Sequence, residues 1–78
     1  MRLPRNLSGT QLIAVLCREF GYERVHQVGS HVILQREDPY HRIAVPDHNP
    51  LRVGTLNSIL RAVATAQNID KKQILRCL

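Results

Sequence analysis

The chain has 78 residues, of which eleven are Lys or Arg and six are Asp or Glu, so its formal net charge is +5. This length predicts one domain over residues 1–78 and leaves no room for a second, and the core of so short a domain is small. No apolar run is long enough for a transmembrane helix, and the absence of Trp argues against a surface that stacks bases on several aromatic rings.

The first predicted element is a helix over residues 9–20. Ser8 and Gln11 have the spacing of a capping box, in which each side chain bonds to the backbone N–H of the other residue. Gly21 follows the helix, at a position where glycine commonly forms the C-terminal cap. The apolar stripe of this helix consists of Leu12, Ile13, Leu16, Cys17 and Phe20.

Three strands are predicted next, over residues 22–28, 31–36 and 41–45, the last of them ended by Pro46. Gly29 and Ser30 form a two-residue turn signal between the first two strands, because glycine supplies the positive φ that a type II′ hairpin requires. The second connection is a turn that contains Pro39, which lacks the backbone donor that a central strand needs. These short connections predict an antiparallel meander.

A second helix is predicted to begin near Thr55, after a loop over residues 46–54 that is rich in Pro, Asn, Asp and Gly. Asp70 and Gln73 repeat the capping-box spacing and predict a short last helix. The apolar stripe of the second helix consists of Leu56, Ile59, Leu60 and Val63.

The predicted order is helix, three strands, helix and short helix, which places the protein in the α+β class. Two helices with apolar stripes can cover one face of a three-stranded antiparallel sheet, so we expect a two-layer sandwich. This order resembles that of the double-stranded-RNA-binding domain. Because a fold alone does not establish a function, the function must be argued from particular residues.

Cys17 and Cys77 are the two cysteines of the chain. A small secreted domain usually carries more cysteines, paired as disulfides, so we expect two buried and reduced thiols, with a disulfide between them as the weaker alternative. Residues 1–7 lack the apolar run of a signal peptide, which predicts a cytoplasmic protein. The spacing of the four histidines does not match the usual zinc patterns, so neither a metal site nor a cofactor is predicted.

His31 is the first candidate for a functional residue, because it directly follows the Gly29-Ser30 turn. Alternation along the strand places Val32 and Leu34 toward the core and His31 on the opposite face. There it would lie beside turn N–H groups that can approach a phosphate. Nine of the eleven basic residues are Arg, whose planar fork of donors fits phosphate oxygens. The alternative is an ordinary surface histidine at the start of a strand.

Two signatures stand in order along the chain. The first is Gly-Ser-His-Val-Ile-Leu at residues 29–34. The second combines Val45-Pro46, His48-Asn49 and Gly54-Thr55-Leu56. Together with Leu3-Pro4 and Ser8-Gly9, they resemble the HicA-type (YcfA-like) family of messenger-RNA interferase toxins over nearly the whole chain.

The resemblance implies a fold similar to the double-stranded-RNA-binding domain and cleavage of messenger RNA without a metal. It also implies inhibition of translation and growth, a role in stress response, and a HicB-type antitoxin that neutralises the toxin by direct binding. The essential histidine of the family lies in the Gly-Ser-His motif and corresponds to His31. Lys71 and Lys72 stand where family members are often acidic, which bears on the antitoxin contact. We expect the free protein to be a monomer.

RNA cleavage of this kind needs a base for the 2′-hydroxyl proton, an acid for the departing 5′ oxygen, and cations for the developing charge. Histidine suits either proton-transfer role, so His31 is assigned as general acid or base without a choice between them. The other expected RNA contacts are Gly29, Ser30, Arg24, Arg36, Arg42 and His48. His48 could also be the second proton-transfer group, although bracing of its own loop is the preferred interpretation.

Three functions are compatible with these residues. A metal-independent ribonuclease toxin predicts that His31→Ala loses cleavage and toxicity while the fold stays intact. A non-catalytic RNA-binding module of the same fold predicts salt-sensitive RNA binding without a product. A domain that binds only a protein partner predicts little affinity for RNA.

Overall fold

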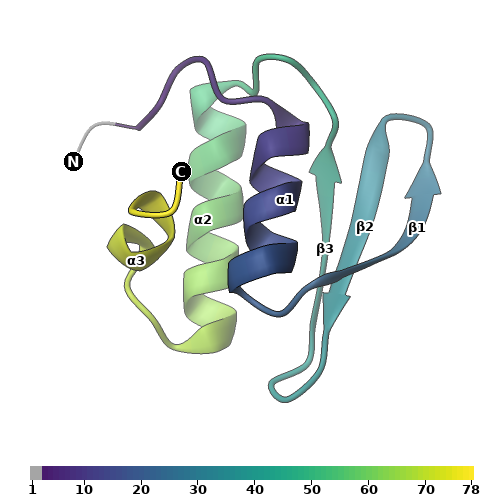
Figure 1. Ribbon diagram of the computed structural model, residues 1–78, viewed down its shortest axis with the longest axis vertical. Helices are drawn as coiled ribbons and strands as arrows, with labels where there is room; N and C mark the ends of the chain where they lie inside the picture. Colours follow the sequence, from purple (N-terminus) through teal and green to yellow (C-terminus); the bar gives the residue numbers. More distant parts are fainter. Residues whose placement is uncertain (1–2) are drawn as a thin grey trace.

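The computed structural model describes residues 3–78 of the chain. Its elements, in chain order, are α1 (Gly9–Glu19), β1 (Glu23–Val28), β2 (His31–Arg36), β3 (His41–Pro46), α2 (Val53–Gln67) and α3 (Lys71–Leu75). This order confirms the predicted α+β class (Figure 1). In the described part of the chain, no helix combines the length and the apolar character needed to cross a membrane.

Capping boxes explain where α1 and α3 begin. Ser8 Oγ accepts a hydrogen bond from the Gln11 N–H at 3.1 Å, and Gln11 Oε1 accepts one from the Ser8 N–H at 2.8 Å. Asp70 and Gln73 form the same reciprocal pair at the start of α3. Gly21 lies just beyond α1 with a φ of +78°, a conformation that glycine adopts without strain. The capping predictions are therefore confirmed.

Four predicted boundaries differ from the structure, and two of them by a single residue: α1 ends at Glu19 and β1 begins at Glu23. α2 begins at Val53 rather than near Thr55, because its N-cap is Arg52, whose side chain makes no capping hydrogen bond. The sequence therefore has no capping residue to mark this start. β3 includes Pro46 as its last residue, which an edge strand tolerates because one side of it has no ladder partner.

The three strands form an antiparallel sheet in the order β1-β2-β3, as predicted. Gly29 has a φ of +58° and Ser30 does not have a positive φ, which is the pattern of a type II′ hairpin. The register between β1 and β2 shifts between Arg24 and His26, so Val25 forms a bulge. This bulge explains why the hydrophobic alternation of the first strand is imperfect.

The helices cover the inner face of β2 and β3 but not β1. Val32, Leu34 and Val45 are completely buried and pack with apolar residues of both long helices. Every residue of β1 is exposed, and Figure 1 shows β1 as the strand farthest from the helices. The core therefore rests on two strands, and the outer face of the sheet, which carries His31, is open to solvent.

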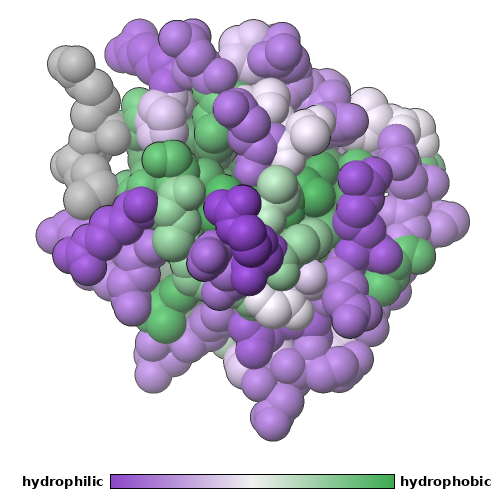
Figure 2. Space-filling view, in the orientation of Figure 1, coloured by the Kyte–Doolittle hydropathy of each residue, from purple (hydrophilic) through white to green (hydrophobic). Residues whose placement is uncertain are grey.

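The helical layer leaves some apolar surface uncovered. Figure 2 shows hydrophobic residues over the helices, surrounded by hydrophilic ones. Part of this surface is a shallow depression between α1 and the end of the chain, lined by Leu7, Val15, Cys77 and Leu78 among others. Cys17 and Cys77 are both free thiols, and they are half-buried rather than buried as predicted.

Polar contacts brace the end of the sheet that lies away from the β1–β2 hairpin. The Tyr22 side chain is buried, and its hydroxyl lies 2.6 Å from Nδ1 of His41. Arg36 donates from Nη1 to the carbonyl oxygen of Phe20 at 2.6 Å and so satisfies the C-terminal end of α1. Burial raises the pKa of Tyr22 and lowers the pKa of His41. This end of the molecule is therefore a structural cluster.

We expect the free energy of unfolding to decrease as the pH falls from about 8 to about 5. The folded state lowers the pKa of His41 below its ordinary value of 6.5, so the unfolded chain takes up this proton more readily. The stability is complete above that ordinary value and is lost as the pH falls through the folded one. Urea denaturation at several pH values measures the effect, and His41→Gln should flatten the dependence. An unchanged slope in His41→Gln would show that other groups cause it.

Candidate active site

A pocket opens at the corner where the end of β3, the following loop and the start of α2 meet. In Figure 1 this corner lies at the upper end of the sheet. The pocket has a volume of about 500 Å³ and is lined by His31, Ala44, Pro46, His48, Leu51, Arg52 and Thr55. Its ionisable lining groups are two imidazoles and one guanidinium, without a carboxylate. Such a lining suits an anionic ligand.

The β1–β2 hairpin directs His31 toward this pocket. His31 is the first residue of β2 and pairs with Pro46 at the end of β3. Because Val32 is buried against the helices, alternation turns the His31 side chain to the exposed outer face. A Cβ built on Gly29 would meet nothing within 4 Å, so the space around the turn is open to a large substrate.

Hydrogen bonds from two sides anchor the loop that carries His48. The Gly9 N–H donates to the carbonyl oxygen of His48 at 2.8 Å. The Asp47 N–H donates to the carbonyl oxygen of Ser30 at 2.6 Å, and Thr10 Oγ1 donates to Asp47 Oδ1 at 2.6 Å. The start of α1 and the hairpin therefore fix the loop together.

Close packing accompanies these hydrogen bonds. A Cβ built on Gly9 would overlap the carbonyl oxygen of Pro46 and would lie 2.8 Å from Cα of Asp47. These neighbours are backbone atoms, which cannot move aside as a flexible side chain can. Only glycine therefore allows α1 to approach the loop this closely.

The hydroxyl of Ser30 links the hairpin to the second histidine. Ser30 Oγ lies 3.4 Å from Nε2 of His48, and the tautomer of the ring decides which atom donates. Ser30 immediately precedes His31 in the chain. The Gly-Ser-His turn thus places one histidine directly and contacts the other through its serine.

Arg52 supplies the positive charge of the pocket. It is the exposed N-cap of α2 and makes no capping hydrogen bond. Within residues 3–78 the one ion pair joins Arg18 to Glu19, so no described carboxylate neutralises Arg52. The first turn of α2 also lacks acidic residues, so the helix dipole adds to the positive potential here.

Arg36, a predicted phosphate contact, lies at the opposite end of β2 from His31. Five steps of about 3.3 Å along the strand separate them by roughly 17 Å. The Arg36 guanidinium is engaged with the carbonyl oxygens of Phe20 and Asp38. The structure therefore does not bring Arg36 to the pocket.

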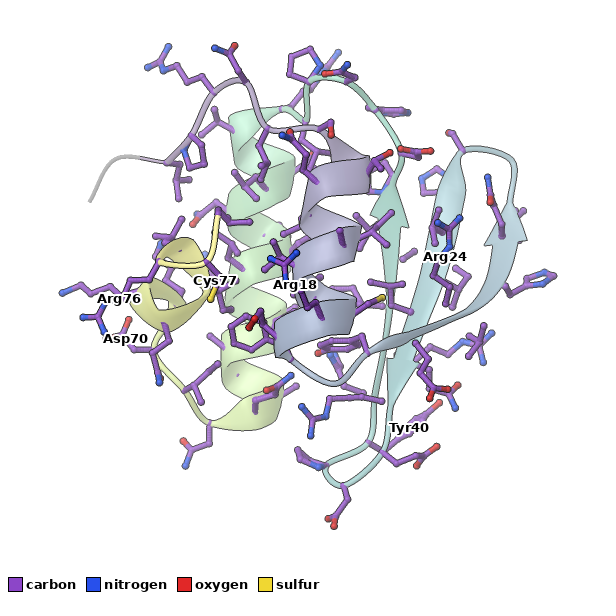
Figure 3. All side chains as sticks on the ribbon, viewed as in Figure 1. Arg18, Arg24, Tyr40, Asp70, Arg76 and Cys77 are labelled. Atoms are coloured by element: carbon purple, nitrogen blue, oxygen red, sulfur yellow. The ribbon has the colours of Figure 1, made fainter. Side chains whose placement is uncertain are left out.

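Arg24 and Arg42 also lie outside the pocket lining. Arg24 pairs with Leu34 across the β1–β2 ladder, and Figure 3 shows its side chain over the middle of the sheet. Arg42 pairs with Gln35 and donates to its side-chain oxygen at 3.3 Å. Arg42 is nearer to the far end of the sheet, whereas the Arg24 guanidinium turns toward the hairpin and donates to Gln27 Oε1 at 3.4 Å. Of the expected contacts, the structure groups Ser30 and His48 with His31.

The remaining histidines do not line the pocket. His26 is exposed on β1 opposite Ile33, and His41 contacts Tyr22 at the far end. Among residues 3–78, no group of three or more His, Cys, Asp or Glu side chains is placed to hold a metal ion.

Sequence reasoning missed Arg52. The available signal was its position four residues after His48, in the same loop. A loop has no regular periodicity, however, so its sequence does not predict where an arginine side chain points. Its membership of the pocket follows from the anchoring of the loop to α1 and to the hairpin.

Comparison with known families identifies the family of the chain. A family model described as the HicA toxin of bacterial toxin–antitoxin systems matches residues 9–64. The matched region includes the hairpin, the anchored loop and most of α2. Neither the curated proteins nor the solved structures compared with the chain include a match.

We expect Gly9→Ala to destabilise the protein by about 1–3 kcal/mol, because the added methyl group overpacks against the loop backbone. Gly54→Ala is the matched control, because a Cβ there meets nothing within 4 Å. That control should be neutral or stabilising by up to about 1 kcal/mol, since alanine suits a helix better than glycine. Urea denaturation measures both variants. Equal stability of the two alanine variants would contradict the close approach at Gly9.

Proposed function

Because the chain belongs to the HicA toxin family of bacterial toxin–antitoxin systems, we propose that it is a metal-independent endoribonuclease that cleaves messenger RNA with His31 as a proton-transfer group. One observation carries this proposal. The exposed imidazole of His31 borders a pocket that also contains a second imidazole and an unneutralised guanidinium. Cleavage of RNA without a metal needs groups of these types.

The pocket chemistry favours RNA over DNA as substrate. RNA carries its own nucleophile, the 2′-hydroxyl beside each phosphate, whereas DNA lacks this group. An imidazole at His31 can remove the 2′-hydroxyl proton or protonate the departing 5′ oxygen. A guanidinium can hold the phosphate by charge-assisted hydrogen bonds. The expected products end in a 2′,3′-cyclic phosphate and a 5′-hydroxyl.

A toxin of this family implies an antitoxin that controls it. We propose a HicB-type protein that binds the free, monomeric toxin in the cytoplasm and blocks the pocket, with release under stress. The pocket lies at an open corner of the molecule, so a partner that covers the hairpin and the start of α2 would exclude RNA. The net charge of +5 favours an acidic binding face on that partner.

We expect His31→Ala to lower the rate of RNA cleavage in EDTA by about 100-fold to 10,000-fold, the usual contribution of one proton-transfer group. His31 is exposed, so the variant should keep its circular dichroism spectrum and melting temperature. His26→Ala is the matched control, since His26 is also an exposed strand histidine but lies outside the pocket. The DNA analogue of the substrate should remain uncut.

Two outcomes would contradict the proposal. Equal cleavage by wild type and His31→Ala would exclude His31 as the catalytic residue. Salt-sensitive RNA binding without any product would instead support a non-catalytic RNA-binding module. Expression of wild type should stop growth, and expression of folded His31→Ala should not.

A further inference from the structure

We infer that His48 is the second proton-transfer group of this site and that Arg52 is its phosphate-binding cation. This inference rests on the proposed ribonuclease function and assigns two groups that the function leaves open. It also replaces the sequence-based preference for His48 as a brace of its own loop.

The backbone and the side chain of His48 make different contacts. The bracing contact is made by its carbonyl oxygen, which accepts the hydrogen bond from Gly9 at 2.8 Å. The imidazole contributes nothing to that bond, and its one hydrogen-bond contact with a described residue is the 3.4 Å approach to Ser30 Oγ. The side chain is exposed and borders the pocket. Backbone hydrogen bonds therefore make the short bracing contacts of this loop, and the imidazole adds only the long contact from Nε2 to Ser30.

The anchored loop gives this imidazole a defined position. Hydrogen bonds fix the backbone on both sides of it, through Asp47 to the hairpin and through Gly9 to α1. His31 lies on the same hairpin, and Ser30 connects the hairpin to His48. Both imidazoles therefore border one open pocket, on a loop and a hairpin that are hydrogen-bonded to each other, which is the arrangement that paired acid–base catalysis requires.

Arg52 is the cation of this pocket because the other candidates are elsewhere. Arg24, Arg36 and Arg42 do not line the pocket, and each of them donates to an oxygen of a neighbouring residue. Arg52 lines the pocket and has no described carboxylate beside it. A phosphate bound between the two histidines would supply the missing negative charge.

The reaction balances with these groups and needs no co-reactant. One neutral imidazole takes the proton from the 2′-hydroxyl, and the 2′ oxygen forms a new bond to phosphorus. The bond from phosphorus to the 5′ oxygen breaks, and the other imidazole, which is protonated, gives its proton to that oxygen. The products are a 2′,3′-cyclic phosphate and a 5′-hydroxyl, and exchange with water restores the two protonation states.

The first test is the pH dependence of cleavage by purified full-length protein on a short RNA in EDTA. Wild type should give a bell-shaped profile, because one imidazole must be neutral and the other protonated. His48→Ala should lose one limb of the bell and about 100-fold to 10,000-fold in rate. His48→Gln checks that the loss does not come from the smaller side chain. His26→Ala should behave as wild type.

A substrate with a 5′-sulfur at the cleavage site assigns the roles. Sulfur leaves without protonation, so the variant that lacks the general acid regains most of its rate on this substrate, while the variant that lacks the base does not. Rescue of either His48→Ala or His31→Ala, but not of both, supports two imidazoles with different roles. If both variants are rescued, or neither is, the paired mechanism is wrong.

Arg52 is tested by Arg52→Gln, with Arg61→Gln on the exposed side of α2 as the control. Loss of a charge-assisted contact to phosphate should lower kcat/KM by about 10-fold to 100-fold. Arg52→Lys should regain part of this loss, because it restores the charge without the bidentate fork. Equal effects of the Arg52 and Arg61 substitutions would reduce Arg52 to general surface charge and overturn its assignment.

The outcomes distinguish this inference from the proposed function. If wild type does not cleave RNA, the proposed function fails. A second outcome is that wild type cleaves RNA, that His31→Ala is inactive, and that folded His48→Ala keeps the wild-type rate and pH profile. In that case only the role assigned to His48 is wrong. Circular dichroism and melting temperature establish that each variant is folded.

Discussion

The contact between Gly9 and the backbone of residues 46–48 is the constraint on which the candidate site depends. A hydrogen bond from Gly9 to the carbonyl oxygen of His48 joins α1 to the loop, and only a residue without a side chain permits the approach. The hairpin reaches the same loop through Ser30 and Asp47. Three segments that are distant in the sequence thereby meet at one corner. Without the contact at Gly9, the loop that carries His48 would be attached to the sheet and the hairpin alone.

The two ends of the sheet differ in how their polar groups are used. At the far end, Tyr22 and His41 contact each other, and Arg36 donates to the end of α1 through Nη1 although its buried Nε has no described partner. At the hairpin end, the histidines are exposed, and Arg52 has no described carboxylate partner. Groups that are mutually satisfied contribute to stability, whereas exposed and unneutralised groups are available to a ligand. Function and stability therefore occupy opposite ends of a short sheet.

The exposure of β1 agrees with this division between a structural end and a functional end of the sheet. The helices bury β2 and β3 but leave β1 exposed, because a chain of 78 residues has little apolar surface with which to cover a third strand. β1 pairs along its inner edge with β2 and completes the hairpin that directs His31. β1 therefore contributes to the geometry of the turn before His31 more than to the hydrophobic core.

The sequence predicted the position of His31 but not which arginine lies beside it, and the difference has a physical reason. His31 could be placed on the outer face because strand alternation is a local property, and the Gly-Ser-His motif supported the family, which the match over residues 9–64 confirms. The arginines were chosen by proximity in the sequence to the strands. Arg36, however, ends the strand that His31 begins, and strand register pairs Arg42 with Gln35 near the same far end. Arg52 was overlooked because it stands in a loop.

Local sequence patterns were enough to predict the order of the elements, both capping boxes, the buried faces of α1, β2 and α2, and the outward direction of His31. All of these depend on interactions over a few residues, through helical period, strand alternation and turn chemistry. The tertiary structure alone decided that His48 and Arg52 share a pocket with His31. The bonds that bring them together span long stretches of chain, such as Gly9 to His48 and Asp47 to Ser30, and no local pattern encodes such bonds.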